Sequence, residues 1–162
     1  MPITIKPYHD DQWKDVWRVL EPVFRAGETY PYADNITAQQ AHHKWVEIPT
    51  ATYVAHDGTD IVGTFYIKPN QDALGDHVCN CGYVTAENAR GKGVASQMCD
   101  FSQQEARRLG FSHMQYNLVV ASNEAAFRLW KKHGFEHVGT LKHAFRHKKL
   151  GLTDAHILYK EL

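Results

Sequence analysis

The chain has 162 residues, of which 43% are hydrophobic and 22% charged, enough for one domain with a single buried core over residues 1–162. Its 18 basic side chains balance 18 acidic ones, so no net charge draws it to nucleic acid or to an anionic membrane. No apolar run approaches the roughly 20 residues of a membrane helix, and the N-terminus lacks the features of a signal peptide. We therefore expect a cytoplasmic protein with a small-molecule partner.

Hydrophobic periodicity and turn signals predict a mixed α/β chain in the order βααβββαβαββ. In the first half they predict a strand at 3–6, helices at 10–27 and 37–47, and a hairpin of strands at 52–56 and 61–67. In the second half they predict a strand at 78–85, a helix at 91–109, a strand at 113–120, a helix at 122–132 and strands at 135–141 and 156–159. Thr37 and Ser122 are the expected caps of their helices.

Three cysteines and eleven histidines raise the question of a metal site. Cys79 and Cys81 lie two apart on a predicted strand, but no second cysteine pair accompanies them. None of the histidines has a recognised zinc spacing. We expect no metal, and we expect Cys79, Cys81 and Cys99 to be buried free thiols in a reducing compartment.

The stretch between Val84 and Ser96 predicts an anion site, because a strand ends there and a glycine-containing segment opens a long helix. Gly91 and Gly93 let a ligand approach the backbone, and Arg90 and Lys92 add positive charge. An ordinary helix start with flexible glycines is the alternative. The nucleotide P-loop motif is absent, and Ser96 replaces the last glycine of the dinucleotide motif.

Two motifs carry a resemblance to a known family. Residues 90–95, Arg-Gly-Lys-Gly-Val-Ala, resemble the acetyl-CoA pyrophosphate signature of the GCN5-related N-acetyltransferase (GNAT) family. Residues 123–135, from Asn123 to Phe135, resemble its second signature, in the expected order and separation. The element order extends the resemblance to nearly the whole chain. It implies a central twisted mixed sheet flanked by helices, with the strands near Val84 and His113 splayed apart.

The resemblance also implies where acetyl-CoA binds as co-substrate. The pantetheine arm would follow the backbone of the fourth strand, the pyrophosphate would lie on the amides that open the next helix, and a later asparagine would contact the arm. The implied cofactor-binding residues are Gly82, Tyr83, Val84, Arg90, Gly91, Lys92, Gly93, Val94, Ala95 and Asn123.

Direct attack of an amine on the thioester requires a neutral amine, a donor for the oxyanion and a proton for the leaving thiolate. A backbone amide near Tyr83 or Val84 is the expected oxyanion donor. The family's usual acidic tyrosine falls at Trp130, whose indole is not a useful acid. Tyr116, Tyr83 or a bound water is the replacement, unless the thiolate leaves without an acid.

The fourth and fifth predicted strands carry Asn80 and Asn117, and the fourth carries no glutamate that would be an obvious base. An asparagine amide can orient an amine or bind a carboxylate, although it cannot accept a proton. Residues 77–83 and 116–119 resemble the fungal azetidine-2-carboxylate N-acetyltransferases, which acetylate proline-related imino acids. On that resemblance Asn80 and Asn117 handle the substrate, and the related loop that contains Tyr30 walls the acceptor pocket. With Tyr116 as a candidate acid, we expect Asn117 and Tyr116 as catalytic residues and Asn80 and Tyr30 as substrate-binding residues.

The leading hypothesis is therefore transfer of acetyl from acetyl-CoA to the amine of a small amino-acid-like metabolite, with proline analogues in that class. Acetylation of a protein or peptide amine is a second hypothesis. A CoA-binding sensor without turnover is a third, supported only by Trp130. The family also suggests a homodimer that meets through the C-terminal strands.

Overall fold

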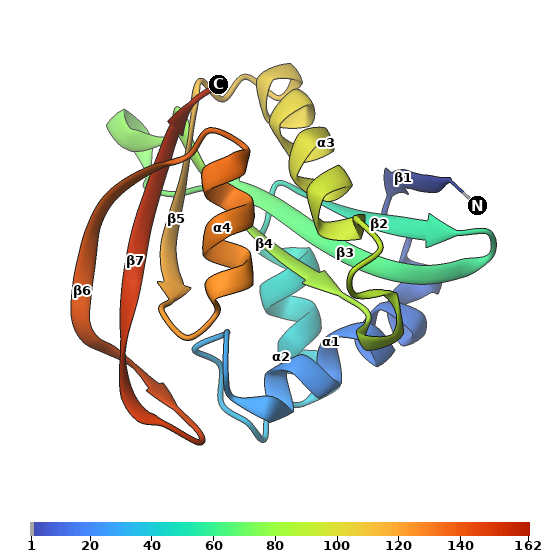
Figure 1. The fold of residues 1–162 in the computed structure, drawn as a ribbon. Helices are drawn as coiled ribbons and strands as arrows, with labels where there is room; N and C mark the ends of the chain where they lie inside the picture. Colours follow the sequence, from blue (N-terminus) through green and yellow to red (C-terminus); the bar gives the residue numbers. More distant parts are fainter. Residues whose placement is uncertain (1) are drawn as a thin grey trace.

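Seven strands form one sheet in the order β1-β2-β3-β4-β5-β7-β6 in the computed structural model, which describes residues 2–162 (Figure 1). Neighbouring strands run antiparallel, except that β4 and β5 are parallel. The strands are β1 (Ile3–Pro7), β2 (Ala51–Asp57), β3 (Asp60–Pro69), β4 (Val78–Thr85), β5 (His113–Val120), β6 (Glu136–His147) and β7 (Gly151–Glu161).

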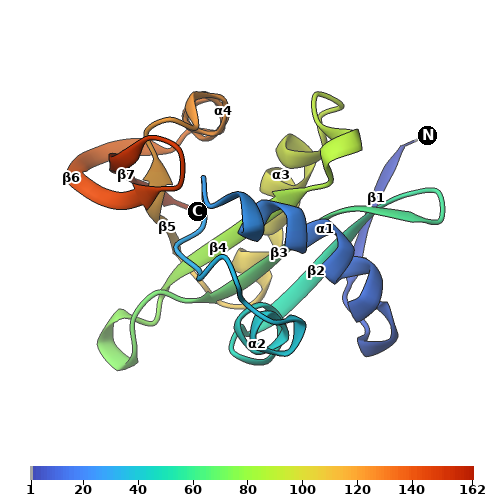
Figure 2. The same cartoon turned by 90° about the horizontal axis from the view of Figure 1, so that it is seen from below.

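Four α-helices cover the two faces of this sheet (Figure 2). Helices α1 (Trp13–Ala26) and α2 (Ala38–His42) lie on one face, and α3 (Val94–Arg108) and α4 (Glu124–Lys132) lie on the other. Strand alternation divides the core accordingly, because Phe65 and Ile67 face α3 whereas Tyr66 faces α1. The predicted mixed sheet flanked by helices is confirmed. Of the helices in residues 2–162, none is both long and apolar enough to cross a membrane.

Helix boundaries differ from the prediction where backbone geometry overrides the sequence pattern. Helix α3 begins at Val94 rather than Gly91, because Gly91 and Gly93 have φ of 77° and 78°, which a right-handed helix does not allow. Asn123, not Ser122, caps α4, its side chain accepting a hydrogen bond from the Ala126 amide. Thr37 caps α2 as predicted, but α2 then widens into the π-helical segment η2 (His43–Glu47).

The last two strands are longer than the predicted segments at 135–141 and 156–159. The part of β6 beyond the predicted segment, residues 142–147, lacks the regular alternation of apolar and polar residues that predicts a strand. Its pairing with β7 shifts register between Leu141 and Phe145, and His143 in this interval has a φ of 54°. Hydrogen bonds between the two strands stabilise a segment whose own pattern is polar. The tip of this hairpin, residues 148–150, reaches the loop after α1.

Candidate active site

The parallel strands β4 and β5 separate soon after they pair. Their register includes only Val78 with His113 and Cys79 with Met114, so the later part of β4 has no strand partner on that side. Asn80 holds the point of divergence, because its amide donates to the Gln115 carbonyl oxygen at 2.9 Å. A cleft of about 1050 Å³ opens beyond this point, between the two strands and the start of α3. The predicted splay is therefore present.

The start of α3 forms one end of the cleft. The first hydrogen bond of the helix runs from the Gln97 amide to the Gly93 oxygen, so the amides of Val94 and Ala95 have no partner within the helix. A Cβ atom at Gly91 would meet nothing within 4 Å, which leaves the backbone there open. Arg90 adds a positive charge at the cleft wall. Free amides, an open backbone and a cation fit the pyrophosphate of acetyl-CoA.

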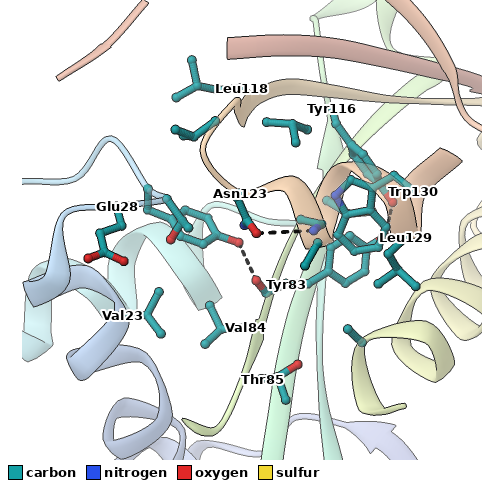
Figure 3. Close-up of a pocket in the computed structure, with 18 of the residues that line it drawn as sticks. Val23, Glu28, Tyr83, Val84, Thr85, Tyr116, Leu118, Asn123, Leu129 and Trp130 are labelled. Atoms are coloured by element: carbon teal, nitrogen blue, oxygen red, sulfur yellow. Dashed lines mark hydrogen bonds between the residues drawn. The ribbon is translucent and has the colours of Figure 1, made fainter. Parts of the chain in front are cut away.

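Aromatic side chains form the floor of the cleft below the gap between β4 and β5. The Tyr83 and Tyr116 hydroxyls lie 2.8 Å apart, and Tyr83 also lies 2.7 Å from the Ser102 hydroxyl. The Trp130 ring packs against both tyrosines, with centroid distances of 5.0 and 5.1 Å (Figure 3). Burial raises the pKa of Tyr116 well above its ordinary value. The Tyr116 hydroxyl therefore already shares a hydrogen bond with the Tyr83 hydroxyl, and its raised pKa makes it a weak acid.

The other end of the cleft gathers polar side chains on the α1 side of the sheet. Asn80 lies opposite Lys68 in the β3–β4 register, so their side chains are cross-strand neighbours. The Lys68 ammonium lies 5.2 Å from the centroid of the Tyr66 ring, and within residues 2–162 no carboxylate lies at ion-pair distance from it. The Tyr30 hydroxyl donates to the Tyr83 carbonyl oxygen at 2.8 Å. This end therefore presents amides, phenols and one uncompensated cation.

Asn117 also lines the cleft and is exposed to solvent. Its amide donates to the Asn70 side-chain oxygen at 2.7 Å, and its own oxygen accepts from the Gln115 side chain at 3.0 Å. These contacts orient Asn117 while leaving it accessible. Asn80 and Asn117, the two asparagines that the sequence singles out, therefore face one cleft from its two strands.

The tip of the β6–β7 hairpin closes the cleft against the loop after α1. The Lys148 amide donates to the Gly27 oxygen at 3.0 Å, and its ammonium lies 3.3 Å from the Asp34 carboxylate. Lys149 pairs with Glu28 at 3.0 Å. We call these contacts the clasp. Glu28, Lys149 and Leu150 line the cleft, so the clasp forms part of its wall.

Most of the predicted site residues line the cleft. They are Tyr30, Asn80, Tyr83, Val84, Arg90, Gly91, Gly93, Val94, Ala95, Tyr116, Asn117 and Asn123. Gly82 and Lys92 are not part of the lining. Gly82 instead makes room for the Tyr66 ring, which a Cβ atom there would overlap, and Lys92 is exposed.

Sequence reasoning missed Lys68, Tyr66 and the clasp. Lys68 is the one basic residue in the otherwise apolar end of β3, and that break in the pattern was the available signal. The clasp left no signal, since it joins residues more than a hundred positions apart. Among residues 2–162, no three His, Cys, Asp or Glu side chains are grouped so that they would hold a metal ion.

Comparison with known proteins identifies the family of this chain. Residues 13–135 match the model of the acetyltransferase (GNAT) family. The chain is 30% identical over 148 residues to N-acetyltransferase aca1 of Schizosaccharomyces pombe, an alignment that covers 81% of this chain and 71% of that protein.

Solved structures agree with this family match. A GCN5-related N-acetyltransferase from Kribbella flavida has a TM-score of 0.93 and 32% identity, with 99% of this chain and 98% of that one covered. A phosphinothricin acetyltransferase from Sinorhizobium meliloti in complex with acetyl-CoA shares the fold, with a TM-score of 0.88, 16% identity and coverage of 100% and 89%. The chain belongs to the GNAT family and is an acetyl-CoA-dependent N-acetyltransferase.

Proposed function

We propose that this enzyme acetylates the amine of a small amino-acid-like metabolite, one that carries a carboxylate beside its amine, with proline analogues in that class. The observation that carries the proposal is Lys68, which lines the cleft beside Asn80 without a carboxylate partner among the described residues. A carboxylate on the acceptor would supply that partner. The adjacent Asn80 and Asn117 amides would then orient the amine.

The charges around the cleft favour an anionic acceptor over a cationic one. Glu28 is the only carboxylate in the lining drawn from residues 2–162, and Lys149 already pairs with it. Burial, and then the nearby ammonium of Lys44, lower the pKa of Lys68. The carboxylate of an acceptor would offset the repulsion between the Lys68 and Lys44 ammonium groups, whereas a polyamine or a basic peptide would add further positive charge beside them.

The clasp supports a small acceptor. It joins the hairpin tip to the loop after α1 across the acceptor end, where an extended peptide would need an open groove. Four aromatic rings of that region, Phe24, Tyr30, Tyr32 and Trp45, pack on one another with centroid distances of 4.9 to 5.9 Å. Such packing gives the wall a rigid apolar surface of the kind that fits a compact ring.

Different residues of this chain have different roles in the acetyl transfer. Bound acetyl-CoA supplies the activated acetyl thioester. We propose that the amides at the start of α3 hold its anionic part, while unpaired β4 backbone near Tyr83 and Val84 provides the oxyanion donor. Asn117 and Asn80 orient the acceptor amine. Tyr116 supports the floor below the reacting atoms, because its hydroxyl is already bonded to Tyr83.

An acceptor panel tests the proposal by thiol release from acetyl-CoA. It includes azetidine-2-carboxylate, proline, its amide and methyl ester, primary amino acids, phosphinothricin, a polyamine and a basic peptide. We expect turnover of a free acid and, because charged hydrogen bonds are worth about 1.5–3 kcal/mol, a loss in kcat/KM of roughly tenfold to hundredfold for its ester. Lys68→Met should remove this preference, whereas Lys142→Met on the exposed face of β6 should keep it. Best turnover of the peptide or polyamine contradicts the proposal.

We also propose that the enzyme works in the cytoplasm and as a homodimer. Its three cysteines are free and buried, which suits a reducing compartment. Val138 and Leu141 are exposed on β6, the edge strand of the sheet, where the C-terminal strands of two copies would meet. Light scattering after size exclusion decides the oligomeric state, and Leu141→Lys should shift a dimer toward monomer.

A further inference from the structure

A chain of hydrogen bonds joins Ser96, His133 and Asp100 at the edge of the cleft. The Ser96 hydroxyl lies 2.8 Å from His133 Nε2, and His133 Nδ1 lies 3.0 Å from the Asp100 carboxylate. Ser96 and Asp100 are one turn apart on α3, whereas His133 follows the end of α4. The His133 side chain is only 11% exposed. The contact therefore fixes one nearly buried ring between two helices.

The chemistry of the three groups determines where the protons lie. A carboxylate only accepts hydrogen bonds, so Nδ1 of His133 carries a proton toward Asp100. In the neutral ring Nε2 has no proton, and it must accept from the Ser96 hydroxyl. In the protonated ring Nε2 donates instead, and Ser96 accepts. Protonation of His133 thus reverses the direction of the Ser96 hydrogen bond.

Ser96 lies where this reversal affects the cofactor. It is the third residue of α3 and lines the cleft beside the free amides of Val94 and Ala95, which fit the pyrophosphate. While Ser96 donates to His133, its oxygen turns only lone pairs toward an anion. When His133 is protonated, the Ser96 proton is free to donate to a phosphate oxygen.

We infer that His133 is a positioning residue that couples binding of the cofactor's pyrophosphate to uptake of a proton, acting through Ser96. The protonated ring frees a donor for the phosphate, and the bound phosphate in turn stabilises the protonated ring. Because such coupling is reciprocal, cofactor affinity rises as the pH falls and binding takes up part of a proton. Charged hydrogen bonds of this kind correspond to an affinity change of about tenfold.

Several charged side chains lie around His133. Asp100 faces the ring from α3, and Lys160 on β7 donates to the His133 carbonyl oxygen at 2.7 Å. Lys131 and Lys132 precede it on α4. Of these side chains, the imidazole is of the type that responds to pH near neutrality.

Calorimetric titration with dephospho-CoA tests the inference. This ligand keeps the pyrophosphate but lacks the 3′-phosphate, whose own titration near pH 6 would obscure the signal. For the wild type we expect the Kd to fall about tenfold between roughly pH 8 and pH 6. Binding in two buffers of different ionisation enthalpy should show proton uptake. Ser96→Ala and His133→Asn should each flatten the pH dependence and abolish that uptake.

His143→Asn is the matched control, because His143 is exposed on β6 and its ring makes no hydrogen bond to the described residues. It should retain the wild-type pH profile. A thermal midpoint measured at each pH shows that the variants are folded. The inference is overturned if Ser96→Ala keeps the proton uptake, or if His133→Asn weakens binding equally at every pH, as a purely structural role would require.

Discussion

The two ends of the cleft are built in different ways. The cofactor end uses consecutive backbone: a strand end, two glycines with positive φ and the first amides of α3. The acceptor end uses side chains of β3, β4 and β5 and the clasp between the loop after α1 and the β6–β7 hairpin. Chemistry held by backbone amides depends on the conformation of a few residues, here the two glycines with positive φ, whereas separate side chains can change one at a time. The acceptor end is accordingly where specificity can vary within one fold.

The largest effect should come from the cofactor end. Gly93→Val places a β-branched residue at a φ of 78°, where strain of roughly 1–3 kcal/mol turns the α3 amides away from their ligand. We expect the Kd for acetyl-CoA to rise by up to about a hundredfold. Calorimetric titration measures it.

Gly110→Val is the control for this prediction. Gly110 has a similar φ of 98° and open space around its Cβ position, but it follows the far end of α3. It should lower the thermal midpoint without changing the Kd. Equal loss of affinity in both variants would show that general strain, and not the cofactor end, explains the effect.

The same contrast explains what the sequence predicted. Residues 90–95 could be identified as part of an anion site because the groups that would bind the anion lie on consecutive residues of the backbone. The order of helices and strands followed from local hydrophobic periodicity. Lys68 and Asn80 become neighbours only through strand register, which neither residue specifies alone. Gly82 was assigned to the cofactor because the family resemblance implies that the pantetheine arm follows the backbone there, whereas the Tyr66 ring that fills the space beside Gly82 comes from the adjacent strand. Long-range pairing, as in the clasp, left no local pattern.

A second prediction separates the two asparagines of the acceptor end. Asn80 is 8% exposed and ties β4 to β5, so Asn80→Ala leaves the Gln115 carbonyl without its donor and should cost about 1–3 kcal/mol of stability. Asn117 is exposed, and Asn117→Ala should raise the acceptor KM about tenfold with no loss of stability. Chemical denaturation and acceptor kinetics measure the two effects. Equal destabilisation by Asn80→Ala and Asn117→Ala would contradict the prediction that only Asn80 contributes to stability.

A smaller effect is expected at the cleft floor, which both ends share. Tyr116→Phe removes the hydroxyl bonded to Tyr83 while keeping the ring stacked on Phe135 at 4.3 Å. We expect a stability loss of about 1 kcal/mol and less than about a threefold change in kcat. The pH profile of kcat should keep its shape. If the decrease of kcat at high pH were absent in Tyr116→Phe, Tyr116 would instead be identified as the acid that protonates the leaving thiolate.

The smallest effect should come from the clasp, because its ion pairs are largely solvated. The hydrogen bond from Lys149, and then its charge, lower the pKa of Glu28. The ion pair therefore contributes to stability above the ordinary glutamate pKa, and this contribution is lost as the pH falls through the lowered value. Near neutral pH its contribution is therefore constant, and salt is the better probe. Glu28→Gln should raise the acceptor KM about twofold at low ionic strength and have no effect near 1 M salt, with the Kd for acetyl-CoA unchanged throughout. A salt-independent rise in KM would mean that Glu28 touches the acceptor itself, which would make the one carboxylate of the lining part of the specificity site and not only of its wall.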